Sequence, residues 1–252
     1  MRIDGTRALI IGGGGEGIGR GITRAYAAAG AAVAVADRDP ERAETAAAEV
    51  RDGGGTACAL TGDVRSLDDV EAMVGATVAE LGGLDVLVTV VGGQVAFVPA
   101  VRLHEMADAD WDVVYELNLR YVARAARAAI RTFLAQGRGG SIVSVGSVTG
   151  FMAAPEQAAY GAAKAGLISL AKTVAAEYAA DGVRMNVVAA GAVATPVADQ
   201  DPAGAAEIPL GRYGTVADVA EAAVYLASPA SSYMTGQRLV VDGGVSVRGP
   251  FG

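Results

Sequence analysis

Four consecutive glycines, Gly12 to Gly15, separate the apolar run Ala8–Ile11 from an Ala-rich segment at helical period, Gly17–Ala29. A short apolar run without polar alternation is typical of a strand that is covered on both faces. Glycine lets the backbone turn sharply after such a strand because it lacks a Cβ. The start of the chain therefore predicts a strand, a tight turn and a helix, the first unit of an α/β fold.

The same alternation of short and long segments continues along the chain. The predicted strands are Ala8–Ile11, Ala32–Ala36, Thr56–Leu60, Val86–Val91, Ser141–Val145, Arg184–Val188 and Arg238–Val241. The predicted helices are Gly17–Ala29, Pro40–Arg51, Leu67–Leu81, Asp110–Ala135, Ala158–Ala180 and Val216–Ala227. Strand–helix alternation favours parallel strands with right-handed crossovers, so the sequence predicts one Rossmann-type, doubly wound parallel sheet of about seven strands with helices on both faces.

No linker, repeat or charge block interrupts the 252 residues, so we expect one domain over residues 1–252. The least regular stretch, Thr195 to Gly214, is rich in Pro, Gly, Asp and Ala. We expect it to be a mobile loop over a substrate site, at about residues 195–214, because loops on a rigid scaffold carry function.

The net charge of −8 argues against a nucleic-acid partner, which requires clustered Lys and Arg. Arginines do recur at roughly helical spacing, at Arg120, Arg124, Arg127, Arg131 and Arg138. We interpret them as the solvated face of one helix rather than as a nucleic-acid site.

The chain has one cysteine, Cys58, and one histidine, His104. Cys58 has no partner for an intrachain disulfide, which suits a reducing compartment, so we expect a cytoplasmic location. No metal is expected, because His104 has no second His or Cys with which to form a zinc site. No membrane partner is expected either, because the uncharged stretch Ala25–Ala36 is shorter than the roughly 20 apolar residues of a spanning helix.

The glycine turn has the spacing of a dinucleotide-binding site. Gly13, Gly17 and Gly19 give G-x-x-x-G-x-G between the first predicted strand and the helix. Glycine allows the backbone to approach a pyrophosphate, and the helix N-terminus presents free N–H groups to it. A run of four glycines can also be an ordinary loop, but the strand–turn–helix setting favours a cofactor.

Two acidic residues follow the next two predicted strands. Asp37 can accept hydrogen bonds from an adenosine ribose and repel a 2′-phosphate, which favours NAD over NADP. Arg38 supports the alternative, because it can pair with that phosphate. Asp63 and Val64 are placed to meet the adenine, although an ordinary capping loop explains them as well.

A serine, a tyrosine and a lysine further along suit proton transfer to an oxygen. Tyr160 and Lys164 are four residues apart in a predicted helix and so project from one face. An ammonium nearby lowers the pKa of a phenol, which makes it a useful general acid or base. Ser147 ends a strand and can donate to a substrate oxygen, and the amide of Asn118 can hold a water that relays protons to Lys164.

These motifs together resemble the short-chain dehydrogenase/reductase (SDR) family over nearly the whole chain, including Asp242-Gly243-Gly244 near the C-terminus. The resemblance implies a catalytic tetrad of Asn118, Ser147, Tyr160 and Lys164, with Tyr160 as acid/base. It implies cofactor contacts at Gly13, Gly17, Ile18, Gly19, Asp37, Arg38, Asp63, Val64, Gly92, Tyr160, Lys164, Gly191, Val193 and Thr195. It also implies a homotetramer or homodimer.

The chain departs from the family pattern at three places. Gly12 replaces a threonine, Ala190 replaces a proline, and Thr89-Val90-Val91-Gly92 stands where the family has Asn-Asn-Ala-Gly. In the family these asparagines tie strands together and frame the adenine side of the cofactor site. Their absence therefore bears on local stability or on cofactor affinity. None of these changes removes a proton-transfer group.

We expect an NAD(H)-dependent oxidoreductase that interconverts a secondary alcohol and a ketone. The predicted substrate residues are Gln94, Phe97, Thr149, Met152 and Gln157, with Ala192 and residues 196–213 beside them. Two alternatives stay open: a carrier-bound 3-oxoacyl reductase, which Asp37 disfavours, and a regulator that binds NAD without catalysis.

Overall fold

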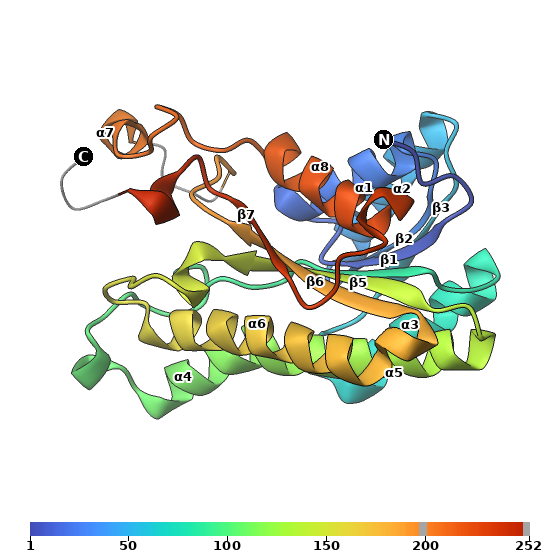
Figure 1. The fold of residues 1–252 in the computed structure, drawn as a ribbon, viewed down its shortest axis with the longest axis horizontal. Helices are drawn as coiled ribbons and strands as arrows, with labels where there is room; N and C mark the ends of the chain where they lie inside the picture. The colour runs from blue at the N-terminus through green and yellow to red at the C-terminus, as the bar shows by residue number, and fades with distance from the viewer. Residues whose placement is uncertain (197–200, 249–252) are drawn as a thin grey trace.

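The computed structural model describes residues 1–196 and 201–248 and contains seven parallel strands in one sheet (Figure 1). The strands are β1 (Arg7–Ile11), β2 (Ala32–Asp37), β3 (Ala57–Thr61), β4 (Val86–Thr89), β5 (Gly140–Ser147), β6 (Val183–Ala190) and β7 (Arg238–Val241). Their order across the sheet is β3-β2-β1-β4-β5-β6-β7. The chain thus winds outward in both directions from the β1–β4 pair, which confirms the predicted fold class.

Helices cover both faces of the sheet (Figure 1). One face carries α1 (Ile18–Ala28), α2 (Pro40–Asp52) and α8 (Val216–Ala227). The other carries α3 (Leu67–Leu81), α4 (Asp108–Tyr115), α5 (Tyr121–Gln136) and α6 (Ala158–Tyr178), and the short α7 (Pro202–Ala206) lies beyond the sheet's end. Within residues 1–196 and 201–248, no helix has both the length and the apolar character that crossing a membrane requires.

Two apolar cores fill the space between the sheet and its helical layers. Successive side chains of a strand point to opposite faces, so β1 contributes to both cores. Leu9 and Ile11 pack toward the layer of α3, α5 and α6, whereas Ala8 and Ile10 pack toward the layer of α1 and α8. The continuous apolar strands of the sequence are explained by this burial on both faces.

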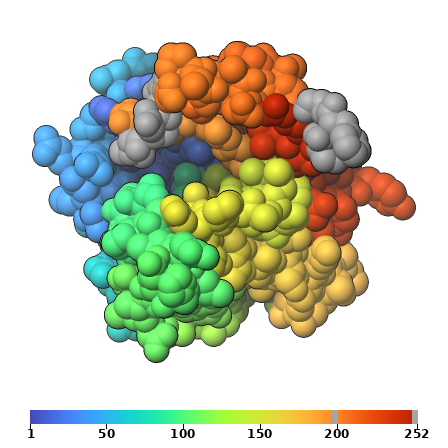
Figure 2. Space-filling model, turned by 90° about the vertical axis from the view of Figure 1, so that its left-hand side faces the viewer, coloured from blue at the N-terminus to red at the C-terminus, as the bar shows by residue number. Residues whose placement is uncertain are grey.

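The carboxyl ends of β1 and β4 lie side by side where the winding direction reverses. Ile11 pairs with Thr89, and Val90 donates a 3.0 Å backbone hydrogen bond to the oxygen of Ile11. In folds of this type, ligands bind in the crevice that opens at this reversal. Figure 2 shows a hollow at this end, surrounded by N-terminal segments in blue, middle segments in green and yellow, and residues after 201 in orange.

The single helix predicted for Asp110–Ala135 is wrong in one respect. A π-helical segment, η2 (Glu116–Arg120), separates α4 from α5. Asn118 lies in this segment and is fully buried, and its Nδ2 atom donates to the carbonyl oxygens of Val114 and Gly93, both at 2.8 Å. An amide bonded both to its own helix and to a neighbouring loop accounts for the local widening, which often marks a functional site.

The predicted irregular stretch, Thr195–Gly214, contains the short helix α7. Asp201 begins this helix by accepting a hydrogen bond from the nitrogen of Ala203 at 3.0 Å, and Pro202 occupies the first position. Residues 197–200 lie outside the described part of the chain. The mobility of the loop stays a prediction.

The strand β4 ends at Thr89, two residues earlier than predicted. The Oγ1 atom of Thr89 donates to the Oγ of Ser144 at 2.8 Å, which joins β4 to β5 through buried side chains. The backbone beyond turns away, and the oxygen of Val91 accepts a 2.8 Å hydrogen bond from the hydroxyl of Tyr121. The hydroxyl pair thus ties the strands at the position where the family pattern has an asparagine.

Candidate active site

The glycine turn after β1 is held tightly between β2 and α1. The nitrogens of Gly12 and Gly13 both donate to the oxygen of Ala36, at 2.8 and 3.2 Å. A Cβ on Gly19 would lie 1.9 Å from the oxygen of Gly12, and one on Gly13 would lie 2.8 Å from Oγ1 of Thr23. These positions require glycine because the neighbouring atoms leave no room for a side chain.

Gly17, by contrast, faces open space at the start of α1. A Cβ there would meet only the Cγ2 atom of Thr195, at 3.9 Å. Among the described residues, no side chain caps this helix end, and its first turn holds no acidic residue. Free N–H groups and the positive end of the helix dipole therefore meet an open turn, which suits a phosphate. Ile18, the first residue of α1, packs against the core beneath.

A cavity of about 410 Å³ continues from the glycine turn across the ends of β2 and β3. Asp37, Arg38, Asp63 and Val64, all predicted to contact the cofactor, line it together. The Oδ1 atom of Asp37 accepts a 3.1 Å hydrogen bond from the nitrogen of Asp39, which fixes the carboxylate at the end of β2. The cavity thus offers the acidic and apolar groups that an adenosine requires.

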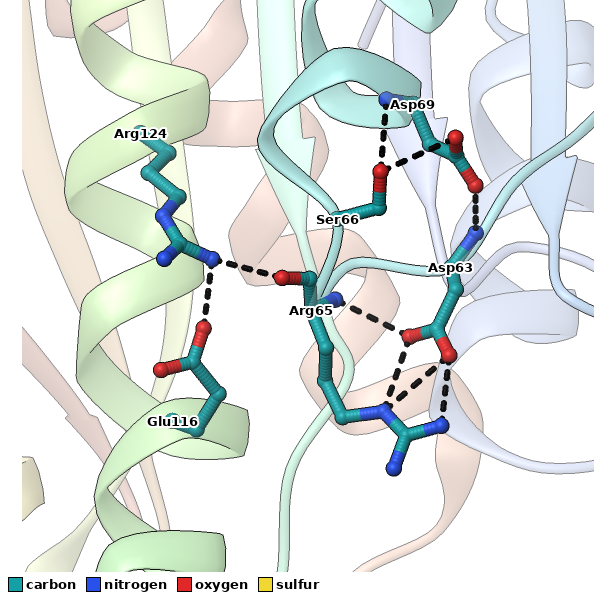
Figure 3. A network of polar contacts seen from close by, with 6 residues as sticks. All are labelled: Asp63, Arg65, Ser66, Asp69, Glu116 and Arg124. Atoms are coloured by element: carbon teal, nitrogen blue, oxygen red, sulfur yellow. Dashed lines mark hydrogen bonds and ion pairs between the residues drawn. The ribbon is translucent and has the colours of Figure 1, made fainter.

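Arg65 is a lining residue of this cavity that the sequence analysis missed. Its guanidinium donates to both carboxylate oxygens of Asp63, with a 2.6 Å bond from Nη2 to Oδ2 (Figure 3). This hydrogen bond lowers the pKa of Asp63, with a smaller contribution from the charge of Arg38, although burial opposes the shift. The position of Arg65, two residues after Asp63 in a loop, was the available signal.

Ser147, Tyr160 and Lys164 come together at the carboxyl end of β5. Ser147 ends the strand, and α6 brings Tyr160 and Lys164 past it on consecutive turns. The Ser147 hydroxyl lies beside the Tyr160 phenol and lowers the pKa of that phenol by hydrogen bonding. The Nζ atom of Lys164 donates to the oxygen of Val145 at 2.9 Å and lies 5.4 Å from the centre of the Tyr160 ring. The end of β5 and one face of α6 therefore bring these three side chains together.

Burial controls the protonation of both Tyr160 and Lys164. It raises the pKa of Tyr160, while the hydrogen bond with Ser147 opposes that rise. It lowers the pKa of Lys164 to about 8, because a buried ammonium loses its hydration. The Lys164 ammonium lies beside the Tyr160 ring and bonds to the oxygen of Val145, and its expected lowering of the pKa of Tyr160 stays a prediction.

Asn118 reaches the site through the loop after β4. Its Oδ1 accepts from the nitrogen of Gly93 at 2.9 Å, and its Nδ2 donates to the oxygen of the same residue. A Cβ on Gly92 would lie 2.5 Å from Oδ1 of Asn118 and 3.2 Å from Nζ of Lys164. The amide thus holds the glycines of this loop, and its role in relaying protons through a water stays a prediction.

The segment after β6 brings the predicted nicotinamide-side residues to the same edge. A Cβ on Gly191 would lie 2.8 Å from Cα of Asp242, so a side chain has no space there. Val193 forms an isolated parallel bridge with Gly214. The Cγ2 atom of Thr195 faces Gly17, which places this segment opposite the start of α1.

The predicted substrate residues occupy different environments. Phe97 lines the 410 Å³ cavity and is 40% exposed. Gln94 is buried, and its Nε2 donates to the backbone oxygens of Glu156 at 2.9 Å and Pro99 at 3.4 Å, so it joins two loops. Thr149 and Met152 follow β5 and are partly buried, whereas Gln157 precedes α6 as its N-cap residue.

Cys58 and His104 lie apart from this group. Cys58 is half-buried on β3, and burial raises the pKa of its thiol, which disfavours a reactive thiolate. His104 is exposed in a short 3-10 turn. In the described part of the chain, no three His, Cys, Asp or Glu side chains gather where they can hold a metal ion.

A parallel doubly wound sheet with an open glycine turn and a Ser–Tyr–Lys group at its edge defines a dinucleotide-dependent oxidoreductase. The chain matches a protein-family model described as Enoyl-(Acyl carrier protein) reductase over residues 13–246. It is 39% identical over 243 residues to a cis-4-hydroxycyclohexanecarboxylate dehydrogenase of Sinomonas cyclohexanicum, covering 94% of this chain and 96% of that protein. A 3-oxoacyl-(acyl-carrier-protein) reductase of Thermotoga maritima is 35% identical over 252 residues, covering 98% of this chain and 100% of the relative.

Solved structures of dehydrogenases also resemble the chain over nearly its whole length. A 7α-hydroxysteroid dehydrogenase complexed with NADH and 7-oxo glycochenodeoxycholic acid superposes with a TM-score of 0.90 at 30% identity, covering 96% of this chain and 95% of that one. A gluconate 5-dehydrogenase from Burkholderia cenocepacia in complex with NADP and tartrate gives 0.91 at 35% identity, covering 98% of both.

The chain belongs to the short-chain dehydrogenase/reductase family. Its activity is that of an oxidoreductase on a secondary alcohol or the corresponding ketone, with a nicotinamide dinucleotide as cofactor.

Proposed function

We propose that this single catalytic domain uses Tyr160 as the general acid/base in NAD(H)-dependent hydride transfer. In the oxidation direction, the Tyr160 phenolate takes the hydroxyl proton of the alcohol, and the C–H hydrogen leaves with its electron pair, which yields the ketone. The nicotinamide, when bound, accepts that hydride. Ser147 donates to the substrate oxygen and holds it beside Tyr160.

The observation that carries this proposal is the convergence of Ser147, Tyr160 and Lys164 at one strand end. The residues present fit a dinucleotide, because Gly17 is open beside a helix start that no described side chain caps. Gly92 also leaves space next to Lys164, since a Cβ on Gly92 would lie 3.2 Å from Nζ of that lysine. Gly13 and Gly19 shape the turn, and Gly191, Val193 and Thr195 would face the nicotinamide end. Lys164 would bind the nicotinamide ribose from its buried position.

A Tyr160→Phe variant tests the proposed role directly. Turnover should fall by about 10²- to 10⁴-fold, the usual contribution of a positioned acid or base, while NADH binding is kept. Tyr178→Phe is a matched control, because Tyr178 ends the same helix away from Ser147. A panel of secondary alcohols and ketones followed by NADH absorbance provides the assay. Normal turnover in Tyr160→Phe would falsify the assignment.

We propose NAD(H) as the preferred cofactor because Asp37 fixes a carboxylate at the end of β2. A carboxylate there accepts hydrogen bonds from ribose hydroxyls and repels a 2′-phosphate. Arg38 and Arg42 line the same cavity and provide the charge that NADP would need. Parallel measurements of kcat/KM with NADH and NADPH decide between the two, and a higher value with NADPH contradicts the proposal.

A 3-oxoacyl reductase is the second candidate, and the full-length similarity to the Thermotoga maritima protein favours it. Asp37 stands against it through the expected cofactor preference. Reduction of an acetoacetyl thioester should be slow relative to simple cyclic ketones if the first candidate holds.

We also propose that the chain works as a homotetramer or homodimer in the cytoplasm. The edge strand β7 leaves Val240 38% exposed, and Tyr233 nearby in sequence is fully exposed. Exposed apolar side chains beside an unpaired strand edge favour a partner surface. A single cysteine suits a reducing compartment. Light scattering coupled to gel filtration measures the mass, and a monomer would contradict the assembly.

A further inference from the structure

The cavity proposed to hold the adenosine has two walls from distant parts of the sequence. The loop after β3 contributes Asp63, Val64 and Arg65. The helical region that contains η2 contributes Val113 and Leu117. No backbone ladder joins a loop to a helix, so the separation of these walls depends on side-chain contacts.

One guanidinium, that of Arg124 in α5, bonds to both walls (Figure 3). Its Nη1 atom donates to the backbone oxygen of Arg65 at 2.8 Å and also to a carboxylate oxygen of Glu116, the residue before Leu117. The side chains of Arg124 and Glu116 are only 22% and 16% exposed. Charge-assisted bonds of this kind are stronger than neutral ones and are less screened when partly buried.

On the loop side, the bond from Arg124 fixes a segment that is already ordered internally. The guanidinium of Arg65 holds the carboxylate of Asp63, and the nitrogen of Asp63 donates to Oδ2 of Asp69 at 2.8 Å. Ser66 caps α3 through the nitrogen of Asp69. The loop is therefore held together by its own contacts, and Arg124 bonds it to the helical wall.

On the helical side, Glu116 opens η2, the segment that carries Asn118. We propose that Arg124 is a positioning residue that sets the separation of the two walls and thereby the affinity for the adenosine half of the cofactor. The inference depends on the proposed function, because it assumes that the dinucleotide binds along this edge. Arg124 acts through Arg65 and Glu116 and touches no reacting atom.

The test compares NADH with reduced nicotinamide mononucleotide, which lacks the adenosine. In Arg124→Gln, the Kd for NADH should rise about tenfold, the usual weight of a lost charge-assisted contact, and the Kd for the mononucleotide should stay unchanged. Arg124→Lys keeps the charge but not the forked geometry and should give an intermediate value. The Tm reports whether the variant is folded.

Arg131→Gln is the matched control. Arg131 lies on the same helix and pairs with Glu71 at 3.0 Å, with both side chains well exposed, so its loss should change neither Kd. Glu116→Gln serves as a second variant if Arg124→Gln folds poorly. It should also raise the Kd for NADH.

Three outcomes overturn the inference. They are an unchanged Kd for NADH in Arg124→Gln, an equal weakening of both ligands, or an equal effect of Arg131→Gln. Failure of the proposed function is distinguishable, because it appears as wild-type protein that binds neither ligand, or as normal turnover in Tyr160→Phe, before any variant of Arg124 is compared.

Discussion

The Nζ atom of Lys164 donates a 2.9 Å hydrogen bond to the backbone oxygen of Val145. The bond joins α6 to β5 two residues before that strand ends at Ser147. It holds Lys164, a residue only 3% exposed, with its ammonium 5.4 Å from the centre of the Tyr160 ring. Burial of this charge has consequences for stability as well as for catalysis.

Lys164→Met should change how stability depends on pH. The pKa of Lys164 is lowered from 10.5 to about 8, so between these values the unfolded chain holds a proton that the native chain has lost. The free energy of unfolding of the wild type should therefore rise with pH in this window, by up to about 3 kcal/mol, and this rise should be absent from the variant. Urea unfolding at a series of pH values measures it, and parallel curves for the two proteins would contradict the shifted pKa.

Ser147→Ala should move the pH profile of alcohol oxidation. Burial raises the pKa of Tyr160 and the hydrogen bond with Ser147 opposes this, so its removal should raise the pKa further. Oxidation needs the phenolate, so the rising limb of kcat/KM should shift to higher pH, and the rate at neutral pH should fall by about tenfold or more. Ser169→Ala, at an exposed position of α6, is the control. An unshifted limb in Ser147→Ala would remove Ser147 from the proton transfer.

Gly92→Ala should damage the site without unfolding the chain. A Cβ at Gly92 would lie 2.5 Å from Oδ1 of Asn118 and 3.2 Å from Nζ of Lys164, so both side chains must shift. We expect a loss of about 1–3 kcal/mol in stability, as in other overpacked sites, and a larger fall in kcat than in cofactor affinity. In Gly75→Ala, the Cβ would meet nothing within 4 Å on an exposed part of α3, so this control should be neutral or stabilising. A wild-type kcat in Gly92→Ala would show that catalysis does not depend on the close approach of Asn118 and Lys164 to Gly92.

Asp37→Asn should shift cofactor preference toward NADPH. The substitution removes the charge that repels a 2′-phosphate, while Arg38 and Arg42 stay in the same cavity. The ratio of kcat/KM for NADPH to that for NADH should rise about tenfold, which corresponds to one unfavourable charge contact. Asp52→Asn, at the far end of α2, tests whether a change of net charge alone has this effect. No change in the ratio would mean that Asp37 does not face the ribose.

The strand and helix pattern was readable in the sequence because burial on both faces leaves continuous apolar runs. The run Ala8–Ile11 and its following glycines predicted β1, the turn and α1 in the observed order. The boundaries were less readable. β5 continues past its predicted end at Val145 to Ser147, because Gly146 and Ser147 still pair with β6.

The interruption of the long helix was not readable, because nothing in the spacing of residues 110–135 announces it. It depends on the contact between Asn118 and Gly93, 25 residues apart in sequence. The role of Arg124 was hidden for the same reason. At the level of sequence it was one of several arginines at helical spacing, and only the fold brings it against the oxygen of Arg65.

The sequence by itself determined which groups the protein can use: the glycines of the turn, the carboxylate of Asp37, and the tyrosine and lysine one helical turn apart. Local spacing is enough for these, because strand and helix periods place neighbours in sequence on predictable faces. Only the tertiary structure decided the environment of those groups. Burial and contacts between distant segments are set by how the layers pack, and they fix the pKa of Lys164, the hold of Asn118 on Gly93 and the walls joined by Arg124.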